Sequence, residues 1–170
     1  MNKQYTFFWN GPLSQWYQSN FKVGGITFNT AEQYMMYHKA MMFGDTAIAK
    51  QILNTGDPKT QKALGRKVAG FKMSEWNKQC IQIVYRGNHA KFTQNQYLYK
   101  ALMNTGTTTL VEASPFDTIW GIGLDEKTAR VTPEEDWKGT NWLGLTLTHL
   151  REFLKDEEEI ERKEKLAQAA

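Results

Sequence analysis

The stretch Asn29-Thr-Ala-Glu-Gln-Tyr-Met-Met-Tyr-His-Lys-Ala-Met-Met-Phe-Gly44 decides the fold, because its pattern predicts one buried helix that carries two ionisable side chains. Thr30 followed three residues later by Gln33 is the pattern of a capping box, and Gly44 supplies a left-handed stop. The helix is therefore predicted to run over residues 31–43. Its other side chains are almost all apolar, which indicates burial on most sides, so we expect the remaining chain to enclose it.

Glu32 and Lys39 are the charged exceptions on this helix. They are separated by about two helical turns, so both project from nearly the same side. In one interpretation, Glu32 only complements the helix dipole, which favours a first-turn carboxylate by about 0.3–1 kcal/mol, and Lys39 extends its stem to water. In the other, both side chains line a polar pocket and carry out chemistry. Spacing alone does not choose between the two.

Length and composition favour one domain with a substantial core, since the chain has 170 residues of which 41% are hydrophobic and 13% aromatic. The single Cys80 excludes an intramolecular disulfide. The three histidines are not at metal-ligand spacing, so we expect neither a metal site nor a cofactor. The sequence contains no leading signal segment and no apolar run of membrane-spanning length, so a soluble, cytoplasmic protein is expected.

The formal charge of +3 conceals a division along the chain. Residues 156–170 hold six acidic and three basic side chains, a net charge of −3, which leaves residues 1–155 at +6. A basic body is typical of proteins that bind nucleic acid or phosphate-bearing ligands, although proteins without such partners carry similar charges. Residues 155–170 are predicted to form a charged helical extension or a frayed tail.

The remaining elements are predicted from turn residues and hydrophobic patterns. We expect an α+β fold, a predominantly α-helical single domain over residues 5–154 with a few short strands. The predicted elements are a strand or a wall of the core at 5–9, a hairpin at 21–28 around Gly24-Gly25, helices at 45–54, 59–68, 75–90 (with Ser74 as N-cap), 96–104 and 145–154, and a strand at 108–113.

Common catalytic frameworks do not occur in the sequence: it lacks a phosphate-binding Walker loop, a Gly-x-Ser-x-Gly elbow and a metal-ligand cluster. A few acids and lysines remain among many aromatic residues. Indoles stack on flat bases at about 1–3 kcal/mol per base, and carboxylates activate water or stabilise an oxocarbenium-like centre. This combination suits cleavage of a nucleoside-type N-glycosidic bond, although tryptophans in a domain of this size also commonly form the core.

Several blocks, taken together and in order, resemble the NADAR, or YbiA-like, family over residues 5–154. They are Phe7-Phe8-Trp9, Leu13-Ser14-Gln15-Trp16, Thr30-Ala-Glu-Gln-Tyr34 with Lys39-Ala40, Gly65-Arg66, Trp76, Lys91-Phe92, Leu110-Val-Glu-Ala-Ser114 with Asp117, Trp120-Gly121-x-Gly123, and Trp137-x-Gly139-x-Asn141-x-Leu143-Gly144. Known members of this family cleave ribosyl N-glycosides. Their substrates are either early riboflavin-pathway intermediates or ADP-ribose attached to guanine in nucleic acid.

The resemblance implies an N-glycosidase without a cofactor, acting on an ADP-ribose-bearing or phosphoribosyl substrate. We favour removal of ADP-ribose from guanine in nucleic acid. The alternatives are a glycosidase of phosphorylated riboflavin-biosynthesis intermediates and a non-catalytic module that binds ADP-ribose or a nucleotide. These expectations leave the oligomeric state and the role of the charged tail open.

The resemblance also assigns residues. Glu32 would orient or deprotonate the attacking group, and Asp117 would bind ribose or stabilise positive charge near the anomeric carbon. Lys39 would neutralise a phosphate or pair with Glu32, or it would instead form a Schiff base with the opened sugar. The predicted substrate-binding residues are Trp9, Ser14, Gln15, Arg66, Trp76, Lys91, Trp120, Gly121 and Asn141; Arg66 and Lys91 are candidate phosphate contacts or ordinary surface charges, and Gln15 departs from the asparagine usual in the family.

Overall fold

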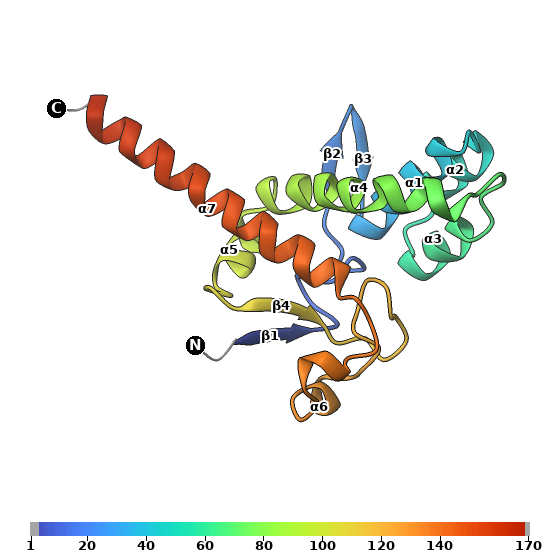
Figure 1. Cartoon of the computed structure of the whole chain (residues 1–170). Coiled ribbons are helices and arrows are strands. Elements are labelled where there is room, and N and C mark those ends of the chain that lie inside the picture. The colour runs from blue at the N-terminus through green and yellow to red at the C-terminus, as the bar shows by residue number, and fades with distance from the viewer. Residues whose placement is uncertain (1–3, 169–170) are drawn as a thin grey trace. The chain divides into compact units, whose positions relative to one another are not determined.

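The computed structural model describes residues 4–168, which fold as two compact units (Figure 1). Residues 9–100 form one unit, and residues 4–8 together with 101–168 form the other. Each unit is described by itself. The fold is α+β and mostly helical with a few short strands, as the sequence predicts.

The unit of residues 9–100 contains a hairpin and a cluster of helices. Their bounds are β2 (Phe21–Val23), β3 (Ile26–Phe28), α1 (Ala31–Met42), α2 (Thr46–Leu53), α3 (Pro58–Gly65) and α4 (Met73–Thr93), with α5 (Gln96–Met103) running across the boundary. The hairpin is antiparallel and places Phe21 opposite Phe28. Gly24 and Gly25 form its turn with φ of 57° and 82°, values that favour glycine, so the predicted hairpin is confirmed.

The first of these helices, α1, begins where the sequence predicts and ends one residue before the predicted bound, with Phe43 as its C-cap. Thr30 Oγ1 accepts a hydrogen bond from the Gln33 N–H at 3.0 Å, and Gly44 has a φ of 73°. Gln33 differs from a standard capping box, because its Oε1 accepts from the Asn29 N–H rather than from that of Thr30. Its Nε2 donates to the Ile52 carbonyl at 3.0 Å, so Gln33 ties the start of α1 to the end of α2.

Three helices, α2, α3 and α4, pack against α1, which makes it the centre of its unit (Figure 1). Two glycines allow the closest approaches. A Cβ at Gly65 of α3 would overlap the Met36 side chain, and one at Gly87 of α4 would overlap the Tyr34 ring. The expected burial is confirmed for the first half of α1, where all of Ala31–Met36 is buried, whereas Met41 and Met42 at its end are exposed.

The long helix α4 differs from its predicted bounds at both ends. Lys72 is its N-cap residue and makes no side-chain capping bond, so the expectation that Ser74 caps the helix is wrong. The backbone is already helical at that point, because the Trp76 N–H donates to the Lys72 carbonyl. At the other end the helix continues to Thr93, so Lys91 and the buried Phe92 belong to it.

The unit of residues 4–8 and 101–168 is built on a parallel pair of strands. β1 (Tyr5–Phe8) pairs with β4 (Thr109–Glu112), and Phe8 lies opposite Glu112 (Figure 1). α6 (Glu126–Ala129) and a 3-10 turn (Glu134–Asp136) follow, and α7 (Trp142–Gln168) packs against β4. The inner face of α7 buries Leu143, Leu147, Leu150 and Leu154.

The last helix runs further than the predicted bounds of 145–154. α7 continues without a break through residue 168, and beyond Lys155 its side chains are exposed. Lys163 pairs with Glu159 at 2.7 Å, an exposed i,i+4 contact of a kind that adds little to stability. Residues 169 and 170 of the predicted tail lie outside the described residues. Between residues 4 and 168, no helix combines the length and the apolar character needed to cross a membrane.

Candidate active site

Glu32, Lys39 and Arg66 form a charged group within the unit of residues 9–100. Glu32 is only 5% exposed although it lies in the first turn of α1, so its carboxylate is more than a solvated complement to the helix dipole. Lys39 is half-buried in the last turn. Burial lowers the pKa of Lys39, the Glu32 carboxylate opposes that shift, and the Arg66 guanidinium adds to it. Glu32 and Arg66 therefore both act electrostatically on Lys39, with opposite effects on its pKa.

Aromatic rings surround the Lys39 ammonium. Its Nζ lies 4.1 Å from the centre of the Phe71 ring and 5.8 Å from that of Trp76. The Phe71 and Phe43 rings form a T-shaped pair with 5.3 Å between their centres, and Phe71 is 37% exposed. Trp76 itself is buried. Phe71 is not among the residues predicted from the sequence, because a lone aromatic residue in a helix-to-helix loop gives no signal of its own.

The Ser14-Gln15 segment lies against the start of α1. The Gln15 carbonyl accepts a hydrogen bond from the Glu32 N–H at 3.0 Å, and Ser14 Oγ accepts from the Trp16 N–H. Gln15 Oε1 accepts from Asn88 Nδ2 at 2.8 Å, whereas the buried Gln15 Nε2 has no hydrogen-bond partner within residues 4–168. An unsatisfied buried donor costs about 1–3 kcal/mol, so this amide is suited to an oxygen of a ligand or a water.

Lys91 is fully buried, with 0% exposure, and its Nζ donates to the Ser14 carbonyl at 2.8 Å. Burial lowers its pKa from 10.5 to about 7. This position excludes the ordinary surface charge that the sequence left open. A phosphate contact for Lys91 stays a prediction, but its ammonium is directed at the backbone of the Ser14-Gln15 segment. Asn88, one turn earlier on α4, was not predicted.

Replacing Lys91 by methionine should change the pH dependence of stability. Between pH 7 and 10.5 the folded state binds fewer protons at this site than the unfolded state, so the destabilising cost of Lys91 is complete below pH 7 and lost above 10.5. We therefore expect the free energy of unfolding of Lys91→Met, measured relative to that of the wild type, to be greater at about pH 6.5 than at about pH 9.5. The change between the two pH values should be of order a few kcal/mol, and the difference in melting temperature should change in the same direction.

Thermal unfolding at the two pH values measures this difference. Lys78→Met is the matched control, because Lys78 lies on the same helix with an exposed side chain. A difference between wild type and Lys91→Met that does not change with pH would contradict the buried titration.

Four predicted site residues lie in the other unit, three of them in one loop. Asp117 Oδ1 accepts hydrogen bonds from the N–H groups of Ile119 and Trp120, at 2.9 and 2.8 Å. The Trp120 ring meets Trp142 edge-on, with 5.8 Å between ring centres. Gly121 is buried where a Cβ would lie 2.9 Å from the Glu112 carbonyl oxygen. These contacts shape the loop, and roles for its residues in substrate binding or catalysis stay predictions.

Asn141 is the fourth, and its amide joins the start of α7 to β4. Its Oδ1 accepts from the Glu112 N–H and its Nδ2 donates to the Leu110 carbonyl, both at 2.9 Å. Its φ of 54° is left-handed, a conformation that asparagine tolerates better than most residues. Asn141 therefore links the start of α7 to β4, and its predicted contact with a substrate stays a prediction. The ninth predicted binding residue, Trp9, is about half-exposed at 46%.

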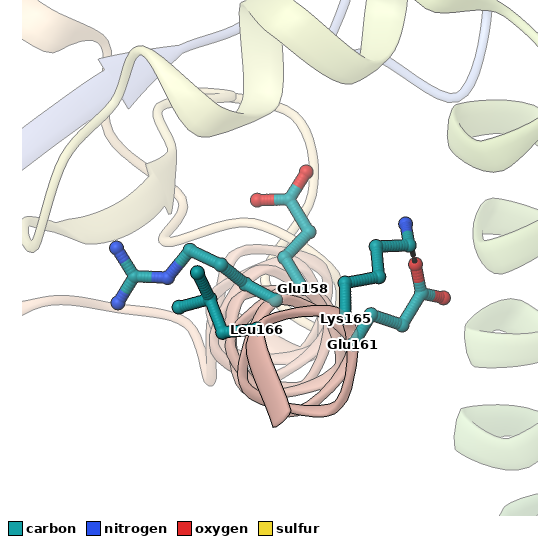
Figure 2. Close-up of a pocket in the computed structure, with 5 residues that line it drawn as sticks. Glu158, Glu161, Lys165 and Leu166 are labelled. Carbon is teal, nitrogen blue, oxygen red and sulfur yellow. Dashed lines mark hydrogen bonds and ion pairs between the residues drawn. The ribbon is translucent and has the colours of Figure 1, made fainter. Parts of the chain in front are cut away.

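A separate hollow lies along the C-terminal part of α7 (Figure 2). Its lining residues are Glu158, Glu161, Arg162, Lys165 and Leu166, all from that helix, and they include none of the predicted site residues. Lys165 and Glu161 form an ion pair there at 3.5 Å. With walls from one helix and mostly charged side chains, this surface is not the enclosed, largely apolar pocket typical of small-molecule sites. Within residues 4–168, no cluster of three or more acidic, histidine or cysteine side chains is placed to hold a metal ion.

Comparison with known proteins agrees with the resemblance seen in the sequence. The model of the NADAR domain family matches residues 7–155. N-glycosidase R617 of Acanthamoeba polyphaga mimivirus is 46% identical over 145 residues, which cover 82% of this chain and 85% of that protein. The NMR structure of the E. coli protein YbiA superposes with a TM-score of 0.76 at 28% identity, covering 93% of this chain and 89% of that one. The riboflavin biosynthesis protein PYRR of Zea mays is 30% identical over 74% of this chain, but only 20% of its own length.

Proposed function

This chain belongs to the NADAR family and is an N-glycosidase, a hydrolase of N-glycosyl bonds, and we propose that it removes ADP-ribose from guanine in nucleic acid. The proposed active site is the Glu32, Lys39 and Arg66 group of the unit formed by residues 9–100. The proposal of a nucleic-acid substrate rests on one observation, the distribution of charge within that unit.

The unit that holds this group is strongly basic. Residues 9–100 contain twelve Lys and Arg against four Asp and Glu, a net charge of +8 within a chain of net charge +3. A small phosphoriboside needs only one or two cations, whereas a nucleic-acid strand is held by a run of them. Such a run leads from α3 to α4, and Arg66, whose charge acts on Lys39, belongs to it. Its exposed members are Lys59, Arg66, Lys67 and Lys72.

The proposed chemistry uses Lys39 as an amine and Glu32 as a proton carrier. Burial and Arg66 lower the pKa of Lys39, which increases the neutral fraction that can attack. The Lys39 nitrogen bonds to the anomeric carbon as the bond from that carbon to the base nitrogen breaks, and Glu32 takes the proton that the lysine loses and passes it to the base nitrogen. The bond from the anomeric carbon to the ring oxygen then breaks, and the remaining N–H proton of the lysine passes to that oxygen, which opens the ribose and leaves an imine. Water then adds to the imine carbon, and cleavage of the carbon–lysine bond releases free sugar and regenerates the amine.

The environment of Lys39 and Glu32 suits this sequence of steps. The Phe71 ring, 4.1 Å from Lys39 Nζ, stabilises positive charge on the nitrogen, as the protonated imine requires. Gln15 Nε2, a buried donor next to the start of α1, would bind a ribose or phosphate oxygen. We keep Asp117 as the group that binds ribose or stabilises charge at the anomeric carbon, on the family resemblance alone.

A second candidate substrate is a phosphorylated riboflavin-biosynthesis intermediate. The observation that favours it is the relative named as a riboflavin biosynthesis protein, which this chain matches over part of that protein's length. A phosphoriboside of this kind carries the same N-glycosidic bond, so the same acid and amine would serve. The two candidates differ in how much the basic run on α3 and the loop that follows it contributes to substrate binding.

The salt dependence of turnover tests the nucleic-acid proposal. On a single-stranded oligonucleotide with ADP-ribosylated guanine, we expect kcat/KM to fall about three-fold per phosphate contact between about 50 and 200 mM salt. The double variant Lys59→Gln, Lys67→Gln should lower kcat/KM and flatten this salt slope by about 1.4, since each contact to a single strand contributes about 0.7. On isolated ADP-ribosylated guanosine it should change little.

The matched control is the double variant Lys163→Gln, Lys165→Gln, at exposed positions of α7. It should leave both kcat/KM on the oligonucleotide and the salt slope of kcat/KM unchanged. Equal kcat/KM values for oligonucleotide and nucleoside, with no loss in the Lys59, Lys67 double variant, would contradict a nucleic-acid substrate.

A further inference from the structure

Two buried polar residues of α4, Asn88 and Lys91, have no part in the proposed chemistry. Both have 0% exposure. Gly87, directly before Asn88, lets α4 approach α1 so closely that a Cβ there would overlap the Tyr34 ring. This close approach carries the next turn of α4 towards the segment that precedes α1.

Hydrogen bonds to the Ser14-Gln15 segment, and one from the Glu32 N–H to that segment, link these residues to Glu32. Lys91 Nζ donates to the Ser14 carbonyl at 2.8 Å, and Asn88 Nδ2 donates to Gln15 Oε1 at 2.8 Å. Asn88 Nδ2 also donates to the Val84 carbonyl of its own helix at 2.9 Å, which fixes the orientation of its amide. The Gln15 carbonyl in turn accepts the Glu32 N–H at 3.0 Å. α4 thereby holds both residues of the segment that contacts the Glu32 backbone.

The burial of Lys91 is costly, so it calls for a reason. An ammonium taken out of water loses its hydration, and a well-packed apolar side chain of similar volume is often at least as stable. Burial is also the cause of the lowered pKa of Lys91. What a methionine of similar length cannot do is donate a hydrogen bond to the Ser14 carbonyl, and that bond is the specific contribution of the lysine.

We propose that Asn88 and Lys91 form a clamp that fixes the Ser14-Gln15 segment and so positions Glu32 for catalysis. They are positioning residues that act through the backbone at the start of α1, and Lys91 does so instead of contacting a substrate phosphate. The catalytic part of this proposal rests on the proposed function, whereas the structural part stands on the hydrogen bonds alone. The clamp also holds Gln15 Nε2 in place for a substrate oxygen.

Hydrogen exchange tests the structural part without any substrate. In Lys91→Met we expect the Glu32 amide to exchange at least about ten-fold faster, while amides in the middle of α1, such as that of Met36, stay within about three-fold of wild type. Lys78→Met should change neither. Equal protection of the Glu32 amide in wild type and Lys91→Met would overturn the clamp.

Kinetics then separate positioning from substrate contact. With the N-glycoside that the wild type hydrolyses, Lys91→Met should lower kcat at least about ten-fold and change the dissociation constant for ADP-ribose by less than about three-fold. Because Lys91 acts through Glu32, Lys91→Met should cost less than about three-fold in a Glu32→Gln background. A ten-fold or greater loss of ADP-ribose affinity would overturn positioning in favour of phosphate contact.

Other outcomes are equally decisive. An unchanged kcat per folded molecule would make Lys91 purely structural and overturn the proposal. If Lys91→Met does not fold, Asn88→Ser carries the same measurements, since serine is too short to reach Gln15; failure of both variants to fold would also overturn the catalytic role. Absence of wild-type turnover on every N-glycoside would instead sink the proposed function, and the exchange experiment would still decide the clamp.

Discussion

Replacing Glu32 by glutamine is expected to lower kcat about 10²–10⁴-fold, the range typical for loss of a general acid or base. Glutamine keeps the size of the side chain and its backbone contact with Gln15, so the dissociation constant for ADP-ribose should change by less than about three-fold. Removing the carboxylate also removes the charge that opposes the lowered pKa of Lys39, so the pKa of Lys39 should fall further. Steady-state kinetics and calorimetric binding measure the two effects.

Glu75→Gln is the matched control, because Glu75 occupies the first turn of α4 but is exposed. Both substitutions lose a favourable interaction with a helix dipole, worth about 0.3–1 kcal/mol, yet only Glu32→Gln should lose turnover. If both variants keep wild-type kcat and lose similar stability, Glu32 is a dipole complement and the proposed site is wrong.

Replacing Lys39 by methionine is the second change with a large expected effect, a loss of kcat of at least about 100-fold. Lys39→Arg should be as inactive, because a guanidinium keeps the charge but stays protonated and cannot form an imine. Sodium borohydride added during turnover should reduce the imine and leave the sugar attached to Lys39 in the wild type. Mass spectrometry of peptides locates the adduct.

Arg66→Gln and Phe71→Leu should shift the pKa of Lys39 in opposite directions. Loss of the Arg66 charge should raise the pKa of Lys39, and loss of the Phe71 ring should lower it. The basic limb of the pH–rate profile should shift accordingly. Repeated absence of a borohydride adduct, together with substantial activity of Lys39→Arg, would show that Lys39 is a charge partner of Glu32 or of a phosphate.

Local signals in the sequence predicted the elements around the site. Thr30, Gln33 and Gly44 determine the bounds of α1 through contacts within a few residues, and Gly24-Gly25 determines the hairpin turn. Such signals depend on backbone conformation and nearby partners, which neighbouring residues largely control. Ser74 resembles an N-cap, so the sequence places the start of α4 too late, whereas the helix already begins at Met73 without a side-chain cap.

Contacts between distant residues could not be predicted in the same way. Asn88 and Gln15 are 73 positions apart, and only the packing of α4 against α1 brings their amides together. Lysines are mostly exposed in proteins, so the buried position of Lys91 runs against the general trend. Phe71 gains its meaning from the Lys39 ammonium above its ring, a contact between loop and helix that no sequence period announces.

The central claim is best tested by mass spectrometry of the products formed from two substrates in parallel, an oligonucleotide with ADP-ribosylated guanine and the riboflavin-pathway phosphoribosides. Our account predicts that the wild-type protein releases free ADP-ribose and restores the unmodified oligonucleotide, and that Glu32→Gln does neither on the same timescale. Cleavage of the phosphoribosides alone would contradict the proposed substrate, and activity on neither substrate would contradict the account of the site.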